Sequence, residues 1–456
     1  MERPSGTERH GLLNGISLLL IVFLVLFPKG GIKIGETPIT WGYVLVGLTA
    51  FPAIVVRLLT LRLAFRPSAL LAFGTVIPFA ILALYSARVN GVTSVGILLS
   101  DLSGFVIFPF LFLLIYPAFL PAIDAARFGR YFRFCVLAAA LWGIFLFIWR
   151  PIFGFYIEIP LLTVNLADFG QLEATKHIDR GAFFKLISTY NNGNVYGVAT
   201  LTLFPLYKLM ERSRWKRAAV RFALVLTLSR TVWLGILIEE LLSLAASFPT
   251  LLMSLPRIDS GQARRRAGAL ALTLVIVFVG FLFSVQSLAF LTDSSLGGRQ
   301  GQFEVFAHPT FLPSLPLAGF AEVMYSSALL LFGITGLLAI LLIFLSPLGL
   351  IALFPKLLQA PTHRAAAKGL FLYAIIAGAD GATNLIPVMA FYWFTYMVFL
   401  HGLPGEQRGG VMERFNWSPS APSQGRWDES VSRDGRQLAC RRLTRSWHGR
   451  SSSERT

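Results

Sequence analysis

The chain has 456 residues, of which 55% are hydrophobic and 14% are charged, and its mean hydropathy is +0.67. A soluble domain carries about a quarter charged residues, so the composition excludes an ordinary water-soluble globular protein. The net charge of +17 would suit a nucleic-acid-binding protein, but the basic residues gather in alternate loops, as they do in membrane proteins. The two cysteines, Cys135 and Cys440, give neither a disulfide framework nor metal-ligand spacing.

Long apolar runs recur along the chain, and several reach the ~17–25 residues that a helix needs to cross a bilayer. The first run has no small-residue cleavage site behind it, so we expect a retained span. The pattern predicts an all-α polytopic membrane protein with about twelve transmembrane helices. The predicted spans are 12–27, 41–59, 69–84, 102–120, 132–149, 192–210, 216–229, 231–250, 268–290, 325–346, 366–380 and 386–402.

Basic residues cluster in the connections that follow the second, fourth, sixth, eighth and tenth spans. Examples are "KLMERSRWKR" (208–217) and "RIDSGQARRR" (257–266). All of these connections fall on one side of the membrane if both termini do, and the positive-inside rule makes that side the cytoplasm. A missed helix would have placed one cluster on the wrong side, so the agreement supports the predicted count.

The opposite side then carries two long loops, 150–191 and 291–324, with mixed charge. Long loops that keep their own structure are more often functional than short connectors. We expect residues 1–403 to form the transmembrane domain. Residues 404–456 are rich in Ser, Arg and Gly and have no apolar periodicity, so we expect a disordered basic cytoplasmic tail.

On the non-cytoplasmic side, arginines stand at three informative places: Arg180 before the sixth span, Arg230 between the seventh and eighth, and Arg299 in the second long loop. The guanidinium group suits phosphate, because its planar fork donates two parallel charge-assisted hydrogen bonds. Two or three such forks from separate loops would hold a pyrophosphate. The alternative for Arg230 is a charge that reaches the lipid headgroups, and for Arg299 a solvated loop residue.

The stretch "TYNNGNVYGV" opens the sixth span with three asparagines. Asn192 and Asn194 either cap the helix, since Asn accepts from free backbone N–H groups, or point into a water-filled cavity and bind sugar hydroxyls. The free amides of a helix start would also favour an anion there.

Further polar positions lie near the ends of the late spans. Glu322, just before the tenth span, is either a general base or a solvated loop residue. Gly333 and Gly336, one helical step apart, predict close approach of another helix. Asp380 is an ionisable group near a membrane break, which favours a functional role, or it lies in a short external turn.

No metal or nucleotide motif accompanies these positions. His177 and His308 are isolated loop histidines without partners at ligand spacing, so we expect neither to bind a metal ion. The chain contains no phosphate-binding loop of the NTPase kind, no dinucleotide fingerprint and no zinc motif.

Together, four of these stretches resemble the O-antigen ligase and O-antigen polymerase superfamily. They are "NNGNVYG", "TLSRTVWLG", "GGRQGQF" and "GFAEVMYSSALLLFGITG". The family has, in the same order, an Asn-Pro/Gly-Asn span start, a Ser-Arg turn, a Gly-Arg loop and a Gly-rich start of a late span. The resemblance covers about 190–345 in pattern and the whole chain in topology.

The resemblance implies an integral inner-membrane glycosyltransferase of the GT-C kind. Such enzymes take a glycan from an undecaprenyl-pyrophosphate carrier at the periplasmic face and transfer it to a sugar hydroxyl, on another carrier-linked glycan or on lipid A core. No nucleotide sugar, metal or other cofactor is expected. Arg230 and Arg299 would bind the donor pyrophosphate with Arg180 as a third candidate, and Asn192 and Asn194 would position the sugar.

One departure separates two activities within the family. Ligases usually carry a His near the start of the late span, whereas this chain has "AEVMYSSAL" there. The difference favours a polymerase in surface polysaccharide biosynthesis, O-antigen or exopolysaccharide, with Glu322 as a replacement base. It leaves ligation open.

A second hypothesis is a lipid-linked glycan flippase or secondary transporter. A transporter should show charged or broken helices near the bilayer midplane. The span centres carry almost no charge and the polar residues gather at one face, which favours an enzyme that works at one membrane surface. A structural membrane protein without chemistry is a third possibility.

Overall fold

The computed structural model describes residues 6–34, 37–59, 65–172, 179–180, 183–245, 300–321 and 323–404. All of them belong to the first of two units, Met1–Met412, the second being Glu413–Thr456. Several sequence predictions lie outside the described residues: the span 268–290, Arg299, Glu322, His177 and the tail from 405 onward.

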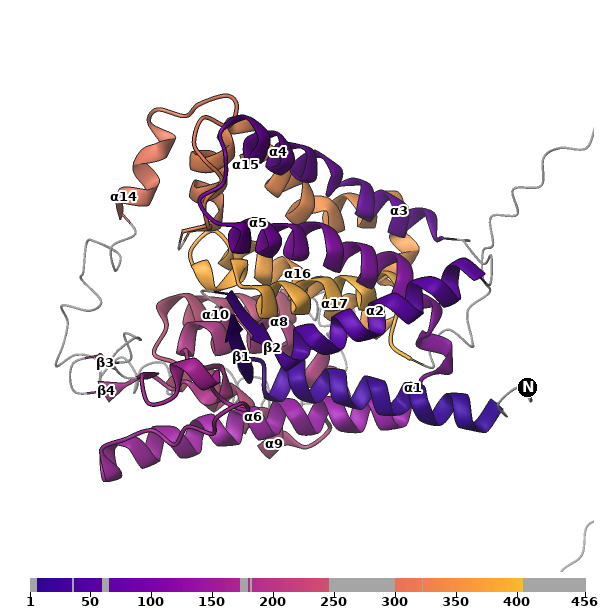
Figure 1. Ribbon diagram of the computed structural model, residues 1–456. Coiled ribbons are helices and arrows are strands. Elements are labelled where there is room, and N and C mark those ends of the chain that lie inside the picture. Colours follow the sequence, from indigo (N-terminus) through magenta and orange to yellow (C-terminus); the bar gives the residue numbers. More distant parts are fainter. Residues whose placement is uncertain are drawn as a thin grey trace, which may run out of the picture. The chain divides into compact units, whose positions relative to one another are not determined.

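The described chain is mostly helical (Figure 1). Its α-helices are α1 (Gly6–Ile21), α2 (Trp41–Leu59), α3 (Pro67–Gly74), α4 (Ile77–Val89), α5 (Val95–Leu102), α6 (Ala125–Phe153), α8 (Gly193–Met210), α9 (Arg214–Leu226), α10 (Arg230–Ala245), α14 (Gln300–Phe303), α15 (Met324–Leu353), α16 (Pro361–Ile376) and α17 (Ile386–His401). π-Helical turns η1 (Val22–Leu26), η2 (Ser103–Ile107) and η3 (Phe110–Ile115) widen some of them.

Two small antiparallel hairpins accompany the helices. Strand β1 (Gly31–Ile34) pairs with β2 (Thr37–Thr40), with Ile32 opposite Ile39. Strand β3 (Asp179–Arg180) pairs with β4 (Phe183–Phe184).

Within the described residues, five stretches are long and apolar enough to cross a membrane: Trp41–Leu59, Pro67–Val89, Val95–Ala118, Ala125–Phe153 and Met324–Leu353. The protein is therefore a helical membrane protein. Every predicted span except 268–290 overlaps a described helix. The number of crossings stays a prediction, because overlap with a helix does not show that the helix crosses. Helix α9, with 13 residues, is only ~20 Å long and shorter than a bilayer core.

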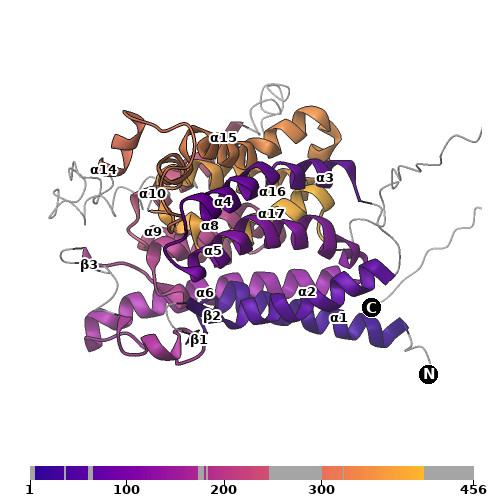
Figure 2. The same cartoon turned by 45° about the horizontal axis from the view of Figure 1, so that its top comes forward.

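Helices α8, α16 and α17 lie in the middle of the bundle (Figure 2). They pack mainly against one another, with α1, α2 and α6 on one side and α3, α4 and α15 on the other. Fourteen residues of α8 are buried, and α17 contributes the buried aromatic residues Tyr392, Trp393 and Tyr396 to the core. The indole of Trp393 donates to the carbonyl of Gly104 at 2.7 Å, inside the wide turn η2.

Hydrogen bonds between distant connections define two ends of the bundle. At one end the backbone amide of Asp124 donates to Oδ1 of Asn14 at 2.9 Å, and the guanidinium of Arg66 donates to the carbonyl of Leu400 at 2.8 Å. We call this the basic end. Its described connections are 65–66, 119–124, 211–213, 354–360 and 402–404.

The opposite end, which we call the polar end, is held together in the same way. The amide of Asn191 donates to the carbonyl of Thr163 at 2.6 Å, and the backbone amide of Met324 donates to the carbonyl of Ala377 at 3.1 Å. Its described connections are 27–34, 37–40, 90–94, 154–172, 183–192, 227–229, 304–321 and 377–385. The basic clusters that the structure describes thus lie at one end and the predicted long loops at the other.

Close contact of α16 with α8 depends on Gly369. A Cβ atom there would collide with the backbone carbonyl of Thr202, which cannot move aside as a flexible side chain would. Small residues at such positions let helix backbones approach in a membrane.

We therefore expect Gly369→Leu to destabilise the protein by at least the roughly 1–3 kcal/mol typical of overpacking, seen as a lower thermal midpoint in detergent. Gly47→Leu on α2 is the matched control, since a Cβ atom there meets no atom within 4 Å. An unchanged midpoint for the Gly369 variant would contradict the described α8–α16 contact.

Candidate functional site

The start of α8 is the centre of the polar end. Asn192 precedes the helix with an extended backbone, and its Oδ1 accepts from the backbone amides of Asn194 at 2.9 Å and Val195 at 3.4 Å. Capping, one of the two roles that the sequence allowed for Asn192, is therefore observed. Because the helix amides occupy this oxygen, only the side-chain nitrogen of Asn192 is left to bind a sugar. Sugar binding by Asn192 stays a prediction.

Three buried oxygens around this helix start have no hydrogen-bond partner among the described residues. They belong to Asn194 in the first turn, Thr189 just before it, and Asn165 in the connection that follows α6. An unsatisfied buried polar group costs roughly 1–3 kcal/mol, so native proteins rarely keep one without a reason. Acceptors of this kind suit a ligand with hydroxyl donors.

Arg230 lies at the same end, at the start of α10. The turn before it, Thr227–Ser229, includes Leu228 with φ of +49°. A Cβ atom on Gly193 would be 3.3 Å from the Thr227 carbonyl, and one on Gly197 would collide with Val232. The first turns of α8 and α10 are therefore in contact, and the structure brings half-buried Arg230 to the end that holds Asn192 and Asn194.

A buried lysine, Lys185, was missed by the sequence analysis. It is only 7% exposed, and its Cβ would lie 3.4 Å from a Cβ atom on Gly193. The backbone of its neighbour Leu186 donates to the carbonyl of Leu226 at 3.0 Å, which ties this segment to the end of α9. A lysine inside "AFFKLIS" was a signal, because a charge within an apolar run is rarely buried without a partner or function.

Arg150 adds another cation at the polar end, also missed from the sequence. It lies in the last turn of α6, with its guanidinium carbon 4.6 Å from the ring centre of Phe184 and 5.8 Å from that of Tyr156. Residues Gly143 and Leu186 are in contact, so the last ten residues of α6 extend ~15 Å beyond the start of α8.

Tyr190 joins the site to η1, the π-helical turn that follows α1. It is buried, and its hydroxyl donates to the carbonyl of Val25 at 2.8 Å. Burial raises the pKa of this hydroxyl well above its ordinary value, so it stays a neutral donor at any physiological pH.

The other predicted site residues are placed only in part. The backbone of Arg180 belongs to β3, but its side chain, like Arg299 and Glu322, lies outside the description. Gln302 and Val323, which are described and stand close in sequence to Arg299 and Glu322, are in contact. The backbone amide of Val323 donates to Oε1 of Gln302 at 2.9 Å. The expected meeting of Arg230 with Arg299 stays a prediction.

Asp380 is 2% exposed, and its Oδ1 accepts from the backbone amide of Ala382 at 3.0 Å. It caps the short helix η11 (Gly381–Asn384), which contacts α8 and α15. The residue therefore lies in a short turn, as one reading of the sequence had it, but the turn is buried at the polar end.

Gly333 has a different role from the one predicted. Its φ of +69° breaks α15, and a Cβ atom there would lie 2.7 Å from the carbonyl of Phe311. The amides freed by the break, those of Ile334 and Thr335, donate to the carbonyls of Thr310 and Phe311 at 2.8 and 3.3 Å. The expected close approach of another helix is thus wrong for Gly333: the neighbour is the second long loop.

Among the described residues, no three His, Cys, Asp or Glu side chains gather as metal ligands would. His308 is exposed on the second long loop. What the site offers is cations, helix starts and unpaired oxygens, a combination that suits an anionic ligand with hydroxyl groups.

These features define a polytopic helical membrane protein with a cationic, amide-rich site at one end of its bundle. Comparison with protein-family models and with curated proteins finds no match.

The capping role of Asn192 predicts that different substitutions there change the stability of the protein differently. Asn192→Ala should lower the free energy of unfolding by about 1 kcal/mol, measured as the denaturation midpoint in detergent. Asn192→Ser and Asn192→Asp should both keep the cap and the stability. Loss of stability in all three variants would contradict a capping role.

Proposed function

We propose that the protein is a GT-C-type membrane glycosyltransferase of the bacterial inner membrane. It elongates or transfers undecaprenyl-pyrophosphate-linked glycan at the periplasmic face during surface polysaccharide synthesis, with both termini in the cytoplasm. The observation that carries the proposal is the meeting of Arg230 and buried Lys185 with the start of α8, where three buried oxygens find no hydrogen-bond partner in the described part of the chain.

The orientation follows from charge. The basic end carries Arg127, Arg130, Lys208 to Arg217 and Lys356 to Lys368, which the positive-inside rule assigns to the cytoplasm. The polar end then faces the periplasm, where lipid-linked glycans are assembled. This assignment also puts the described part of both long loops on the substrate side.

The chemistry proposed at the polar end is a single displacement. A hydroxyl oxygen of the acceptor sugar attacks the anomeric carbon of the donor, a glycosidic bond forms, and the bond between that carbon and the pyrophosphate oxygen breaks. Undecaprenyl pyrophosphate leaves, and Glu322 accepts the hydroxyl proton.

The residues would divide this work by their chemistry. Arg230, Arg299 and Lys185 stabilise the charge that develops on the leaving pyrophosphate, usually the largest catalytic term, with Arg180 as a further phosphate ligand. Asn194 and the amide nitrogen of Asn192 hold sugar hydroxyls. The proposal includes no metal ion or other cofactor.

Polymerisation is preferred to ligation for the reason found in the sequence. The sequence from Glu322 into the start of α15 reads "EVMYSSAL" and offers no His as the base that the family's ligases carry. The acceptor would then be another carrier-linked glycan and not lipid A core.

Arg230→Ala should abolish long-chain surface polysaccharide in a strain that depends on this gene, because the leaving group loses its bidentate ligand. Arg230→Lys should also fail, since Lys gives a point charge without a fork. Arg57→Ala, at the basic end of α2, is the control and should leave the glycan ladder on a gel unchanged. A normal ladder with Arg230→Ala would overturn the mechanism.

A second candidate, a lipid-linked glycan flippase or transporter, is favoured by a charge cluster in the bundle. Lys208 lies 3.1 Å from Glu239 and 3.6 Å from Glu240, and Arg221 pairs with Glu240. Both carboxylates fall at the centre of the predicted span 231–250, although their partner Lys208 belongs to the last turn of α8, toward the basic end. The expectation that span centres carry almost no charge is wrong there, and α15 is broken as transporter helices often are.

The two functions differ in what Glu240 must do. An enzyme that works at the polar end needs this carboxylate for stability alone, so Glu240→Gln should lower the thermal midpoint yet leave glycan chain length normal at matched protein level. Transport of a lipid-linked glycan in proteoliposomes, lost in Glu240→Gln and intact in Arg230→Ala, would favour the second candidate.

A further inference from the structure

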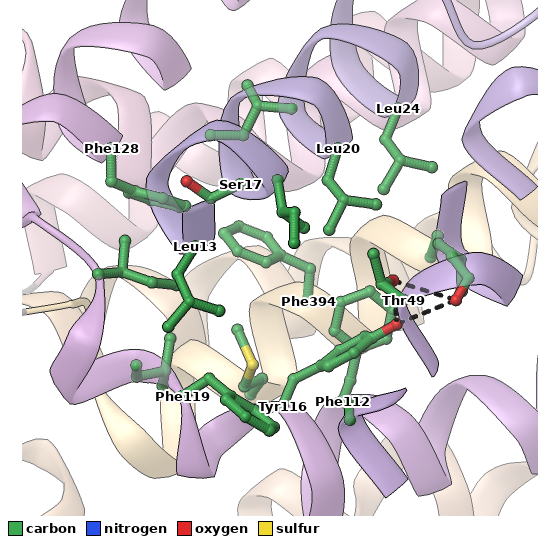
Figure 3. A pocket seen from close by; sticks show the side chains of 18 of the residues that line it. Leu13, Ser17, Leu20, Leu24, Thr49, Phe112, Tyr116, Phe119, Phe128 and Phe394 are labelled. Carbon is green, nitrogen blue, oxygen red and sulfur yellow. Dashed lines mark hydrogen bonds between the residues drawn. The ribbon is translucent and has the colours of Figure 1, made fainter. Parts of the chain in front are cut away.

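A long apolar groove runs between α1 and α2 (Figure 3). Its volume is about 370 Å³, within the ~300–1,000 Å³ of small-molecule sites. Residues Leu12 and Leu48 line it yet remain 68% and 66% exposed, so its rim opens sideways. The inner wall is made by buried residues of the central helices, among them Leu203 of α8 and Phe391 of α17.

The lining of the groove is almost entirely hydrocarbon. The few polar side chains that line it are already satisfied: Ser17 donates to the carbonyl of Asn14 at 2.9 Å, and the hydroxyl of Thr49 lies 2.8 Å from the carbonyl of Leu45 and 3.1 Å from the Tyr116 hydroxyl. Figure 3 shows the side chains of Thr49 and Tyr116 turned toward each other at the wall of the groove. The site therefore suits a chain without polar groups.

One end of the groove lies at the polar end of the bundle. Val25 lines the groove, and its carbonyl accepts from Tyr190, two residues before the α8 cap Asn192. The chain of a lipid whose headgroup lay at the start of α8 would thus begin beside the end of the groove that Val25 lines.

The length of the groove indicates which kind of lipid chain would fill it. From Leu12 to Val25 it follows α1 and η1 for ~20 Å at 1.5 Å per residue. One leaflet of a bilayer core is only ~15 Å deep, half of the ~30 Å total. A chain that fills the groove must pass the bilayer midplane, which a long isoprenoid does and an ordinary acyl chain does not.

We infer that this α1–α2 groove binds the isoprenoid tail of a lipid whose anionic headgroup lies at the start of α8. The inference rests on the proposed function for the identity of the lipid, and on the groove itself for the position of its chain. The lipid would enter sideways from the bilayer between α1 and α2.

The test uses the full-length protein in nanodiscs and a photoreactive C55 polyprenyl phosphate. We expect labelled peptides from α1 and α2. Ala53→Phe, which fills the groove, should reduce labelling roughly fivefold, the factor that about 1 kcal/mol of lost affinity gives, and Ser17→Leu should do so from the α1 side. Gly47→Phe, on the open face of α2, should label like the unmodified protein, with thermal midpoints confirming that all three fold.

Competition separates the long chain from ordinary lipid. Unlabelled C55 polyprenyl phosphate should displace the probe, whereas farnesyl phosphate and phosphatidylglycerol at equal concentration should not. Equal displacement by all three, or equal labelling of Ala53→Phe and the unmodified protein, would overturn the inference. A labelled groove together with a normal ladder from Arg230→Ala would overturn the proposed enzyme and leave the lipid site standing.

Discussion

A backbone amide or carbonyl inside a bilayer finds no water, so each must be satisfied within the protein. That constraint governs the places where this bundle departs from regular helix. At Gly333 the break in α15 frees amides, and carbonyls of the second long loop accept from them. At η2 the carbonyl of Gly104 accepts from an indole of α17. At these two places another segment completes the hydrogen bonds of irregular backbone.

The start of α8 follows the same constraint with a different result. Its backbone amides are capped by Asn192, but side-chain oxygens nearby are left without described partners. Buried side-chain oxygens without a partner are rare in native proteins and call for an explanation. Cations Arg230 and Lys185 gather at the same place, which is why this end, and not the basic end, is proposed to hold the substrate.

The sequence predicted what depends on local pattern. Apolar run length located the helices, with α2 matching its predicted range, and the three asparagines of "NNGN" indicated the cap at Asn192. It missed what depends on contacts between distant segments. Lys185 falls in a predicted loop, because its place in an apolar stretch does not show that the start of α8 packs against it. Gly333 looked like a helix-contact residue because its partner, Phe311, belongs to a loop.

Charge was also misjudged where pairing lies across helices. Glu239 and Glu240 stand in an apolar run, and their partners Lys208 and Arg221 come from two other helices. Sequence spacing does not show such neutralisation. Arg230 and Arg299 pose the same problem, since only the position of Arg230 is described.

The hydrogen bonds at Gly333 carry a mechanical consequence. The loop from 309 to 317 is hydrogen-bonded both to the part of α15 that follows Gly333 and, through Asn90 and Thr93, to the connection after α4. Moving the loop away would leave the backbone amides of Ile334 and Thr335 without their acceptors. A molecule that displaced this loop would therefore have to replace those acceptors or disturb α15, whose Phe344 packs against Tyr392 in the aromatic centre of the bundle.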